Sequence, residues 1–242
     1  MITAFWAALG FLTCLPVPRG LPHGGPTAGH SVVMYPLAGL VIGALCGIEA
    51  ALFDGVGEGL RAAIVVTLWV ALTGGLHLDG LADWADAWAA GRGDRDRSLA
   101  VLEDPHAGAM AIVAVVLVLL VKFAALAEVL GGQAYAPLIL APVLGRTAVT
   151  LVLLTTPYVR VSGLGSELLA NLPRRAAIGS AGVAFVVCAF GLGVFATASA
   201  LATVYLLRRF MIAHLGGCTG DTLGATVEVV EAVILVTAAS GL

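Results

Sequence analysis

Long apolar runs alternate with short polar segments along this chain. The apolar runs cover residues 31–53, 60–76, 107–129, 134–156, 176–213 and 222–242. A helix needs about 20 predominantly apolar residues to cross the hydrocarbon core of a bilayer. The run over 176–213 is too long for one helix, so we expect two short helices there, with a break near Ala198–Ala200. The pattern therefore predicts an all-α, polytopic bundle of about seven membrane spans.

The N-terminal segment is apolar but too short for a span. Its first 15 residues are followed by prolines at positions 16, 18 and 22, which interrupt helical hydrogen bonding. The basic start of a cleaved signal peptide is missing. We expect a short surface or re-entrant helix here, and the sequence does not decide whether it enters the membrane.

Two polar segments separate the predicted spans. Residues 91–104 carry charges of alternating sign, and residues 157–175 are also polar. Charges of mixed sign are typical of a solvated surface. Both segments are therefore predicted to be loops.

Composition supports a membrane protein and excludes other classes. Hydrophobic residues make up 60% of the chain and charged residues only 11%, a balance far from that of soluble domains. The 242 residues have room for seven spans and short loops, which indicates a single transmembrane domain over residues 1–242. With 12 Lys and Arg in total, the chain lacks the basic surface that nucleic-acid binding requires.

The arginines predict the orientation of the bundle. Loops on the cytoplasmic side of a membrane carry an excess of Lys and Arg. If the N-terminus is cytoplasmic, only Arg61 lies in an outer loop, and the inner segments hold Arg19, Arg92, Arg95, Arg97, Arg160, Arg174, Arg175, Arg208 and Arg209. The same orientation places the segments 77–88, 157–175 and 214–222 on the cytoplasmic face. We therefore expect a cytoplasmic active site.

Three carboxylates interrupt the apolar pattern in the stretch His77–Trp88. On a helix of 3.6 residues per turn, Asp79, Asp83 and Asp86 fall within an arc of roughly 60°. Like charges on one helix face repel each other unless a cation lies between them. We predict that these aspartates bind a divalent metal ion, and a solvated helix face outside the bilayer is the alternative.

A second acidic group follows a glycine-rich turn near the C-terminal end. Asp221 and Glu228 are seven residues apart, so they share one face of a helix that enters a span. Acidic side chains in a span are costly and default to a functional interpretation. Glycines at positions 216, 217 and 220 allow the backbone to approach a phosphate closely. We expect Asp221 and Glu228 to meet the first acidic group at the metal.

Carboxylates in two groups predict Mg²⁺, which commonly bridges protein carboxylates to substrate phosphates. This arrangement favours phosphoryl transfer, because metal ions and basic groups stabilise charge on phosphate oxygens. Arg146 is the best candidate for the basic group, with a structural pairing to a buried carboxylate as the equal alternative. Lys122 is similar but can also extend towards the interface. His77 is a candidate general base or phosphate ligand, with local hydrogen bonding as the alternative.

Five blocks of sequence occur in an order that is typical of a known family. They are Phe11–Pro18, Tyr35–Leu40, Thr73–Asp83 with Asp86, Leu144–Arg146, and Gly216–Glu231 with its Thr-Gly-Asp-Thr-Leu-Gly-Ala core. On these blocks the chain resembles the cobalamin synthases, which are adenosylcobinamide-GDP ribazoletransferases of the bacterial inner membrane. A further block, Leu102–Gly108, departs from the family pattern. It keeps Asp104 and Gly108 but has Glu103 and His106 where basic residues are usual.

The resemblance implies a Mg²⁺-dependent reaction of adenosylcobinamide-GDP with α-ribazole or its 5′-phosphate. A ribose hydroxyl of the acceptor attacks the phosphorus attached to the cobinamide arm, GMP leaves, and adenosylcobalamin or its 5′-phosphate results. We expect three sets of site residues: the metal ligands Asp79, Asp83, Asp86, Asp221 and Glu228; the catalytic His77 and Arg146; and the substrate-binding Lys122, Asp104, Gly217, Thr219 and Gly220.

Two other functions are compatible with spaced carboxylates in a membrane protein. A CDP-alcohol phosphotransferase also uses aspartates and Mg²⁺, but its usual Asp-Gly-x-x-Ala-Arg pattern is not met here. A cation transporter would use the carboxylates as a permeation site, near the middle of the bilayer rather than at helix starts on one face. Membrane lipid is the expected surrounding, and the preferred acceptor, the number of metal ions and homo-oligomerisation are left open.

Overall fold

The computed structural model describes residues 1–21, 24–104, 106–160 and 164–241. Within these residues the regular secondary structure is helical, and no β-strand is present beyond one isolated bridge between Tyr158 and Cys218. The helices are α1 (Ile2–Leu12), α2 (Pro26–Ser31), the 3₁₀ turn η1 (Val32–Met34), α3 (Tyr35–Leu52), α4 (Glu58–Thr73), α5 (Leu76–Gly91), α6 (Arg95–Val101), α7 (Ala109–Gly131), α8 (Tyr135–Thr155), α9 (Leu164–Ala170), α10 (Arg174–Leu192), α11 (Val194–Leu215) and α12 (Gly220–Ala239). The predicted all-α class is confirmed.

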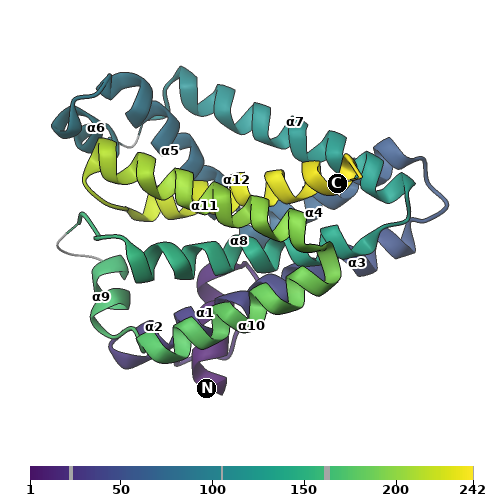
Figure 1. The fold of residues 1–242 in the computed structure, drawn as a ribbon, viewed down its shortest axis with the longest axis horizontal. Coiled ribbons are helices and arrows are strands. Elements are labelled where there is room, and N and C mark those ends of the chain that lie inside the picture. The colour runs from purple at the N-terminus through teal and green to yellow at the C-terminus, as the bar shows by residue number, and fades with distance from the viewer. Residues whose placement is uncertain (22–23, 105, 161–163, 242) are drawn as a thin grey trace.

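The membrane spans agree with the apolar pattern. In the described part of the chain, six helical segments are long and apolar enough to cross a membrane, or seven if the bent pair α4 and α5 counts as one span. The longest helices run along the long axis of the molecule (Figure 1). One predicted boundary is wrong, because the break between α10 and α11 lies at Gly193 rather than near Ala198–Ala200. Gly193 has φ +85°, a conformation that glycine adopts without steric cost.

Two segments that we predicted as loops contain short helices. Helix α6 lies in the charged segment 91–104, and helix α9 lies in the polar segment 157–175. Helix α6 begins where the backbone N–H groups of Asp96 and Arg97 donate hydrogen bonds to the Asp94 carboxylate. A capping side chain of this kind starts a helix whose surface stays polar, so the charge pattern alone could not reveal it.

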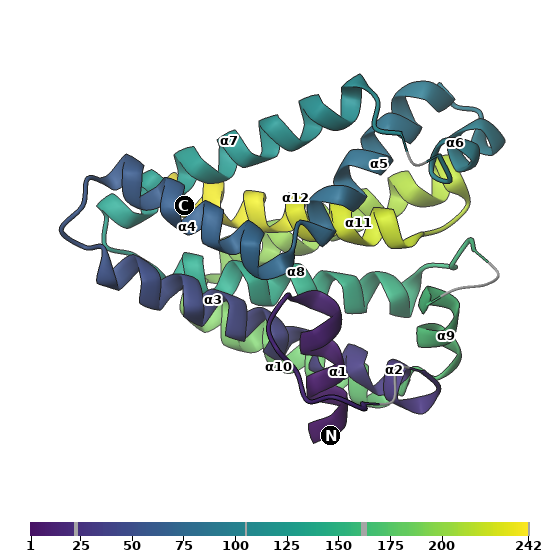
Figure 2. The ribbon, with the colours of Figure 1, turned by 180° about the vertical axis from the view of Figure 1, so that it is seen from behind.

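The N-terminal segment forms helix α1, which is too short to cross a bilayer. It packs against α2 and α3 (Figure 2). The described part of the proline-rich stretch that follows, residues 16–21, has no helix, as predicted. The position of α1 relative to the membrane stays a prediction.

Helix α8 lies at the centre of the bundle and packs against α3, α10 and α12. The approach of α3 depends on glycines. A Cβ atom at Gly39 would lie 2.3 Å from the carbonyl oxygen of Pro142, and one at Gly43 would lie 2.1 Å from that of Ile139. Small residues allow helices in a bilayer to pack backbone against backbone, so these glycines determine how closely α3 approaches α8.

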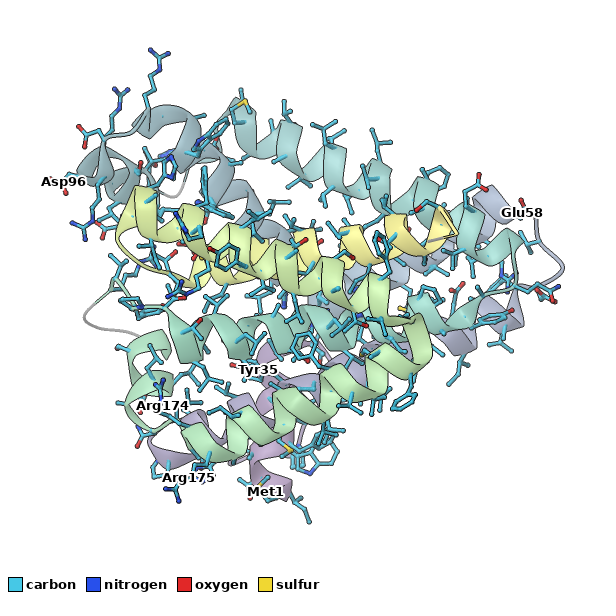
Figure 3. All side chains as sticks on the ribbon, in the orientation of Figure 1. Met1, Tyr35, Glu58, Asp96, Arg174 and Arg175 are labelled. Carbon is cyan, nitrogen blue, oxygen red and sulfur yellow. The ribbon has the colours of Figure 1, made fainter. Side chains whose placement is uncertain are left out.

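The polar segments gather at one end of the bundle. The α5–α6 region, the end of α8 and the junction of α11 with α12 all lie at the same end in both ribbon views (Figures 1 and 2). Figure 3 shows Asp96, Arg174 and Arg175 at this end and Glu58 at the opposite end. This placement brings the two predicted acidic groups to the same end of the molecule.

Candidate active site

A sharp bend between α4 and α5 directs the first acidic group towards α12. The two helices meet at an angle of 88°. Gly74 and Gly75 between them have φ values of +60° and +73°, which residues with a Cβ atom rarely adopt. After the bend, α5 packs against the start of α12, where Gly80 and Gly224 allow close contact of the two backbones.

The structure brings Asp79, Asp83 and Asp221 together at this contact. The charges of Asp79, Asp221 and, to a smaller extent, Asp86 are close enough to act on the carboxyl group of Asp83. Arg160, which follows α8, forms an ion pair of 3.0 Å with Asp221 and donates to the carbonyl oxygen of Leu102. The result is an acidic cluster, defined as Asp79, Asp83 and Asp221, with one arginine at its edge.

Asp86 lies on the same face of α5 as Asp79 and Asp83, but it is hydrogen-bonded to α7. Its carboxylate accepts hydrogen bonds from the backbone N–H groups of Gly108 and Ala111. These N–H groups lie at the start of α7, where the helix itself offers them no partner. A Cβ atom at Gly108 would lie 2.7 Å from the Asp86 carboxylate, which explains why a glycine suits this position. Asp86 therefore joins α5 to α7.

A cavity of about 320 Å³ opens beside the acidic cluster. Its polar lining includes Asp79, Asp221, Arg160 and Tyr158. The remainder of the lining is mostly apolar and comes from Phe11, Leu12, Tyr35, Leu76, His77, Gly80, Val149, Leu153, Gly165, Leu168, Gly220, Leu223, Gly224 and Val227. Its volume is within the range of small-molecule sites.

Glu228 lies apart from the acidic cluster, in a buried ion network. It is seven residues beyond Asp221, so a rise of 1.5 Å per residue places it roughly 10 Å further along α12. Its carboxylate accepts a hydrogen bond of 2.6 Å from Lys122 on α7. Lys122 also donates to Glu231, which accepts a further hydrogen bond from Arg146 on α8. We call Lys122, Arg146, Glu228 and Glu231 the buried ion network.

The buried ion network contains Lys122 and Arg146, the two basic residues that we predicted to face the substrate phosphates. Lys122 is 4% exposed and Arg146 is fully buried. Within the described chain, neither residue lines the cavity beside the acidic cluster. Of the alternatives for Arg146, the structure shows the pairing with a buried carboxylate, and it shows the same for Lys122. The ammonium of Lys122 also lies over the Trp69 ring, 4.9 Å from its centroid.

Comparison with known proteins identifies the family. The family model described as Cobalamin-5-phosphate synthase matches residues 4–239. The chain belongs to this family. The matched range includes both the acidic cluster and the buried ion network.

Curated relatives agree with the family match. A protein of Stutzerimonas stutzeri is 47% identical over 231 residues, which cover 95% of this chain and 94% of that protein. A Pseudomonas putida protein is 47% identical over 239 residues, covering 98% of this chain and 99% of that protein. Both are named adenosylcobinamide-GDP ribazoletransferase. No solved structure gives a significant match.

The glycine-rich turn of this cobalamin-5-phosphate synthase family member is built around the start of α12. Thr219 caps the helix, since its hydroxyl accepts a hydrogen bond from the N–H of Thr222. A Cβ atom at Gly217 would lie 2.2 Å from the carbonyl oxygen of Pro157, so the close approach that this glycine permits is to the protein backbone. Gly220 lines the cavity, and its role in binding substrate stays a prediction.

The remaining predicted residues fall into two environments. His77 is 2% exposed and lines the cavity. Asp104 is exposed, and its carboxylate accepts hydrogen bonds from the ring and backbone nitrogens of His106, which lower the pKa of the Asp104 carboxyl group. In the block where this chain departs from the family pattern, Asp104 and His106 are therefore hydrogen-bonded to each other.

Sequence reasoning missed Arg160 and Tyr158 as site residues. A two-sided backbone contact places them there, because Cys218 donates to Pro157 O and Val159 donates to Cys218 O. The sequence did indicate that this loop lies near the site, because the arginine distribution places segments 157–175 and 214–222 on one face. It did not single out Arg160 among the other loop arginines.

The acidic cluster offers the donor atoms that Mg²⁺ prefers. Among the described residues, no three carboxylate, imidazole or thiol side chains are close enough to surround a metal ion by themselves. Mg²⁺ commonly keeps several waters and uses one or two carboxylates together with substrate phosphates. The acidic cluster beside the cavity fits such a site, in which one or two of its three carboxylates would hold the ion together with substrate phosphates.

Gly80→Ala is expected to separate the two halves of the acidic cluster. The added Cβ atom would lie 2.7 Å from the carbonyl oxygen of Asp221, and backbone atoms there cannot rotate away. We expect a loss of stability of roughly 1–3 kcal/mol, as for overpacking, with a fall in activity. Thermal unfolding in detergent and GMP release measure the two effects.

Gly179→Ala is the matched control for this prediction. A Cβ atom at Gly179, on α10, meets no atom within 4 Å. Alanine in a helix interior favours folding by about 0.5–1 kcal/mol relative to glycine. Equal stability and activity in the two alanine variants would contradict the close contact between α5 and α12.

Proposed function

We propose that this chain is an adenosylcobinamide-GDP ribazoletransferase that acts on α-ribazole or its 5′-phosphate. The observation that carries the proposal is the family match over residues 4–239, on a fold that places Asp79, Asp221 and Arg160 in the lining of one cavity. The named relatives support the same activity. The reaction joins the two precursors by a single phosphoryl transfer.

In the proposed reaction, a ribose hydroxyl of the acceptor attacks the phosphorus that carries the cobinamide arm. The new P–O bond to ribose forms as the P–O bond to GMP breaks, and GMP leaves with that bonding pair. The hydroxyl proton passes to a carboxylate of the acidic cluster, of which Asp79 lines the cavity. Mg²⁺, when bound, neutralises charge on the diphosphate oxygens.

Arg160 has a separate task in the proposed mechanism. Its guanidinium is about one-third exposed and lies beside Asp221, so a donor nitrogen can turn to a phosphate oxygen in the cavity that Arg160 lines. Arginine offers a planar set of donors that matches phosphate oxygens. Arg160 therefore takes the phosphate-facing role that the sequence suggested for Arg146.

We place the enzyme in the bacterial inner membrane with this end of the bundle in the cytoplasm. The candidate spans support a multi-pass protein. Arg174 and Arg175 lie at the same end as the α5–α6 region (Figure 3), and basic residues favour the cytoplasmic side. Nucleotide substrates are made in the cytoplasm, which agrees with this orientation.

Release of GMP tests the proposed function and its dependence on Mg²⁺. Purified chain in lipid nanodiscs is expected to release GMP from adenosylcobinamide-GDP only when α-ribazole or its 5′-phosphate is present. A chelator is expected to stop the reaction, and added Mg²⁺ to restore it. Release that continues unchanged in chelator contradicts the Mg²⁺ requirement.

Two controls separate the rival functions. CDP-diacylglycerol in place of adenosylcobinamide-GDP is expected to yield no CMP, and its release would favour a CDP-alcohol phosphotransferase. Metal flux into sealed proteoliposomes without any nucleotide chemistry would favour a cation transporter.

A further inference from the structure

Two arginines from different helices meet at the C-terminal end of α8. Arg174, at the start of α10, donates to the carbonyl oxygen of Leu154 at 2.6 Å. Arg208, near the end of α11, donates through Nε and Nη2 to the carbonyl oxygen of Thr155 at 3.1 and 2.8 Å. Leu154 and Thr155 are consecutive residues in the last turn of α8, so the two guanidinium groups lie near each other. We call Arg174 and Arg208 the arginine pair.

The arginine pair carries more positive charge than the end of α8 offsets. The C-terminal end of a helix carries roughly half a negative charge, whereas each guanidinium carries a full positive charge. Among the described residues, neither arginine forms an ion pair with a carboxylate. Each guanidinium also keeps N–H donors that its contact with α8 does not use. The pair therefore attracts an anion.

The helices that carry the arginine pair present apolar faces to their surroundings. Only 22% of the candidate span in α10 and 28% of that in α11 are buried inside the protein. The two helices diverge from Gly193, and the end of α8 lies between them (Figure 1). Ile178 is one helical turn from Arg174 and Leu201 is two turns from Arg208, so each shares a helix face with its arginine. Their side chains are 60% and 44% exposed.

We propose that the arginine pair and the apolar faces beside it bind an anionic phospholipid. The lipid phosphate lies against the two guanidinium groups, whose planar donors match phosphate oxygens. The acyl chains lie along α10 and α11, over Ile178 and Leu201. A headgroup with a net negative charge is favoured over a zwitterionic one, because the excess positive charge repels the headgroup cation of a zwitterionic lipid. This lipid site is separate from the acidic cluster and takes no part in the proposed reaction.

The position of the arginine pair favours a lipid over a free phosphate ion. Arg174 is the first residue of one candidate span, and Arg208 lies within the last two turns of the next. Both therefore lie close to the level of the lipid headgroups, where basic residues attract anionic lipids. A free phosphate ion would contact the arginine pair alone and leave the apolar faces without a role.

Lipid binding to the full chain in a non-ionic detergent tests the proposal. Native mass spectrometry measures the affinity for phosphatidylglycerol and for phosphatidylcholine with the same acyl chains. We expect phosphatidylglycerol to bind roughly tenfold more tightly, as for the attraction of two basic residues to an anionic headgroup. Inorganic phosphate in large excess is expected not to displace it.

The double variant Arg174→Gln and Arg208→Gln is expected to lose most of this preference. Arg175→Gln is the matched control, because Arg175 is the next residue of α10, is also exposed and points away from α8 (Figure 3). Ile178→Glu is a second test that keeps both arginine contacts with α8. It places a carboxylate one turn from Arg174, so it is expected to weaken phosphatidylglycerol binding and to leave phosphatidylcholine binding nearly unchanged.

Several results would overturn the proposal. In the wild-type chain they are equal affinities for the two lipids, or displacement of phosphatidylglycerol by inorganic phosphate. In the variants they are a preference that persists after both arginines are replaced, or an equal loss in Arg175→Gln. If the double variant does not fold, an unchanged preference in Ile178→Glu is decisive against the site.

Discussion

Asp79→Asn and Asp83→Asn are each expected to lower the rate of GMP release by at least roughly 10²-fold, because a metal-held diphosphate is worth several kcal/mol of transition-state stabilisation. Both carboxylates belong to the acidic cluster beside the cavity. Asparagine has nearly the same shape but carries no charge, so it weakens metal binding without changing the packing of α5. GMP release, measured over a range of Mg²⁺ concentrations, gives the size of the effect.

The folded state is expected to tolerate these substitutions. Asp79 is exposed and Asp83 is partly buried, and removal of one charge relieves repulsion within the cluster. Unfolding temperatures in detergent should therefore equal or exceed that of the wild-type chain. An inactive variant that remains folded locates the defect in the chemistry.

Asp96→Asn is the matched control. Its side chain is 94% exposed on α6, at the same end of the bundle, and its contact with Arg95 is long at 3.9 Å. We expect full activity from this variant. Full activity in Asp79→Asn and Asp83→Asn as well would remove both residues from the site.

The sequence was sufficient to predict the spans and the meeting of the two acidic helix starts. Apolar length decides which segments enter a bilayer, and this rule located every long helix except for the break at Gly193. The arginine distribution then placed α5 and the start of α12 at one end. The contact of Gly80 with Asp221 agrees with that prediction.

The sequence could not decide what each charged side chain faces. Helical spacing places Asp221 and Glu228 on one face, but it does not say that one reaches a cavity while the other meets Lys122. The partner of Glu228 comes from α7, over a hundred residues away in the chain. Pairing across such a separation depends on tertiary packing, which periodicity within one helix cannot reveal.

Arg160 illustrates the same limit for a loop residue. Its position depends on the backbone contact between the segments around Tyr158 and Cys218. Nothing in the local sequence distinguishes Arg160 from the other loop arginines. Its role follows only from the ion pair with Asp221.

Glu231→Gln is expected to cause the largest loss of stability. The Glu231 carboxylate is fully buried and accepts hydrogen bonds from both Lys122 and Arg146. Neutralising it leaves two buried cations with one remaining anion, Glu228. Removing one partner of a buried ion pair costs about 3–5 kcal/mol. Unfolding in detergent, followed by circular dichroism, measures the loss.

Glu128→Gln is the control for this substitution. Glu128 lies on α7, the helix that also carries Lys122, but it is exposed. Loss of an exposed charge changes stability by at most about 1 kcal/mol. Equal unfolding temperatures for Glu128→Gln and Glu231→Gln would contradict the structural role of the buried ion network.

A combined variant tests whether the buried ion network stabilises the fold, or whether only an imbalance of its charges destabilises it. Replacing all four members together, as Lys122→Met, Arg146→Met, Glu228→Leu and Glu231→Leu, leaves no buried charge without a partner. Apolar residues of similar volume often replace a buried ion network without loss of stability, so this variant is expected to unfold near the wild-type temperature while Glu231→Gln does not. If the combined variant is as unstable as Glu231→Gln, the attraction between the four charged side chains itself stabilises the folded state. In either case the acidic cluster is expected to keep its place, because none of its members belongs to the network, and Asp79 and Asp221 line the cavity.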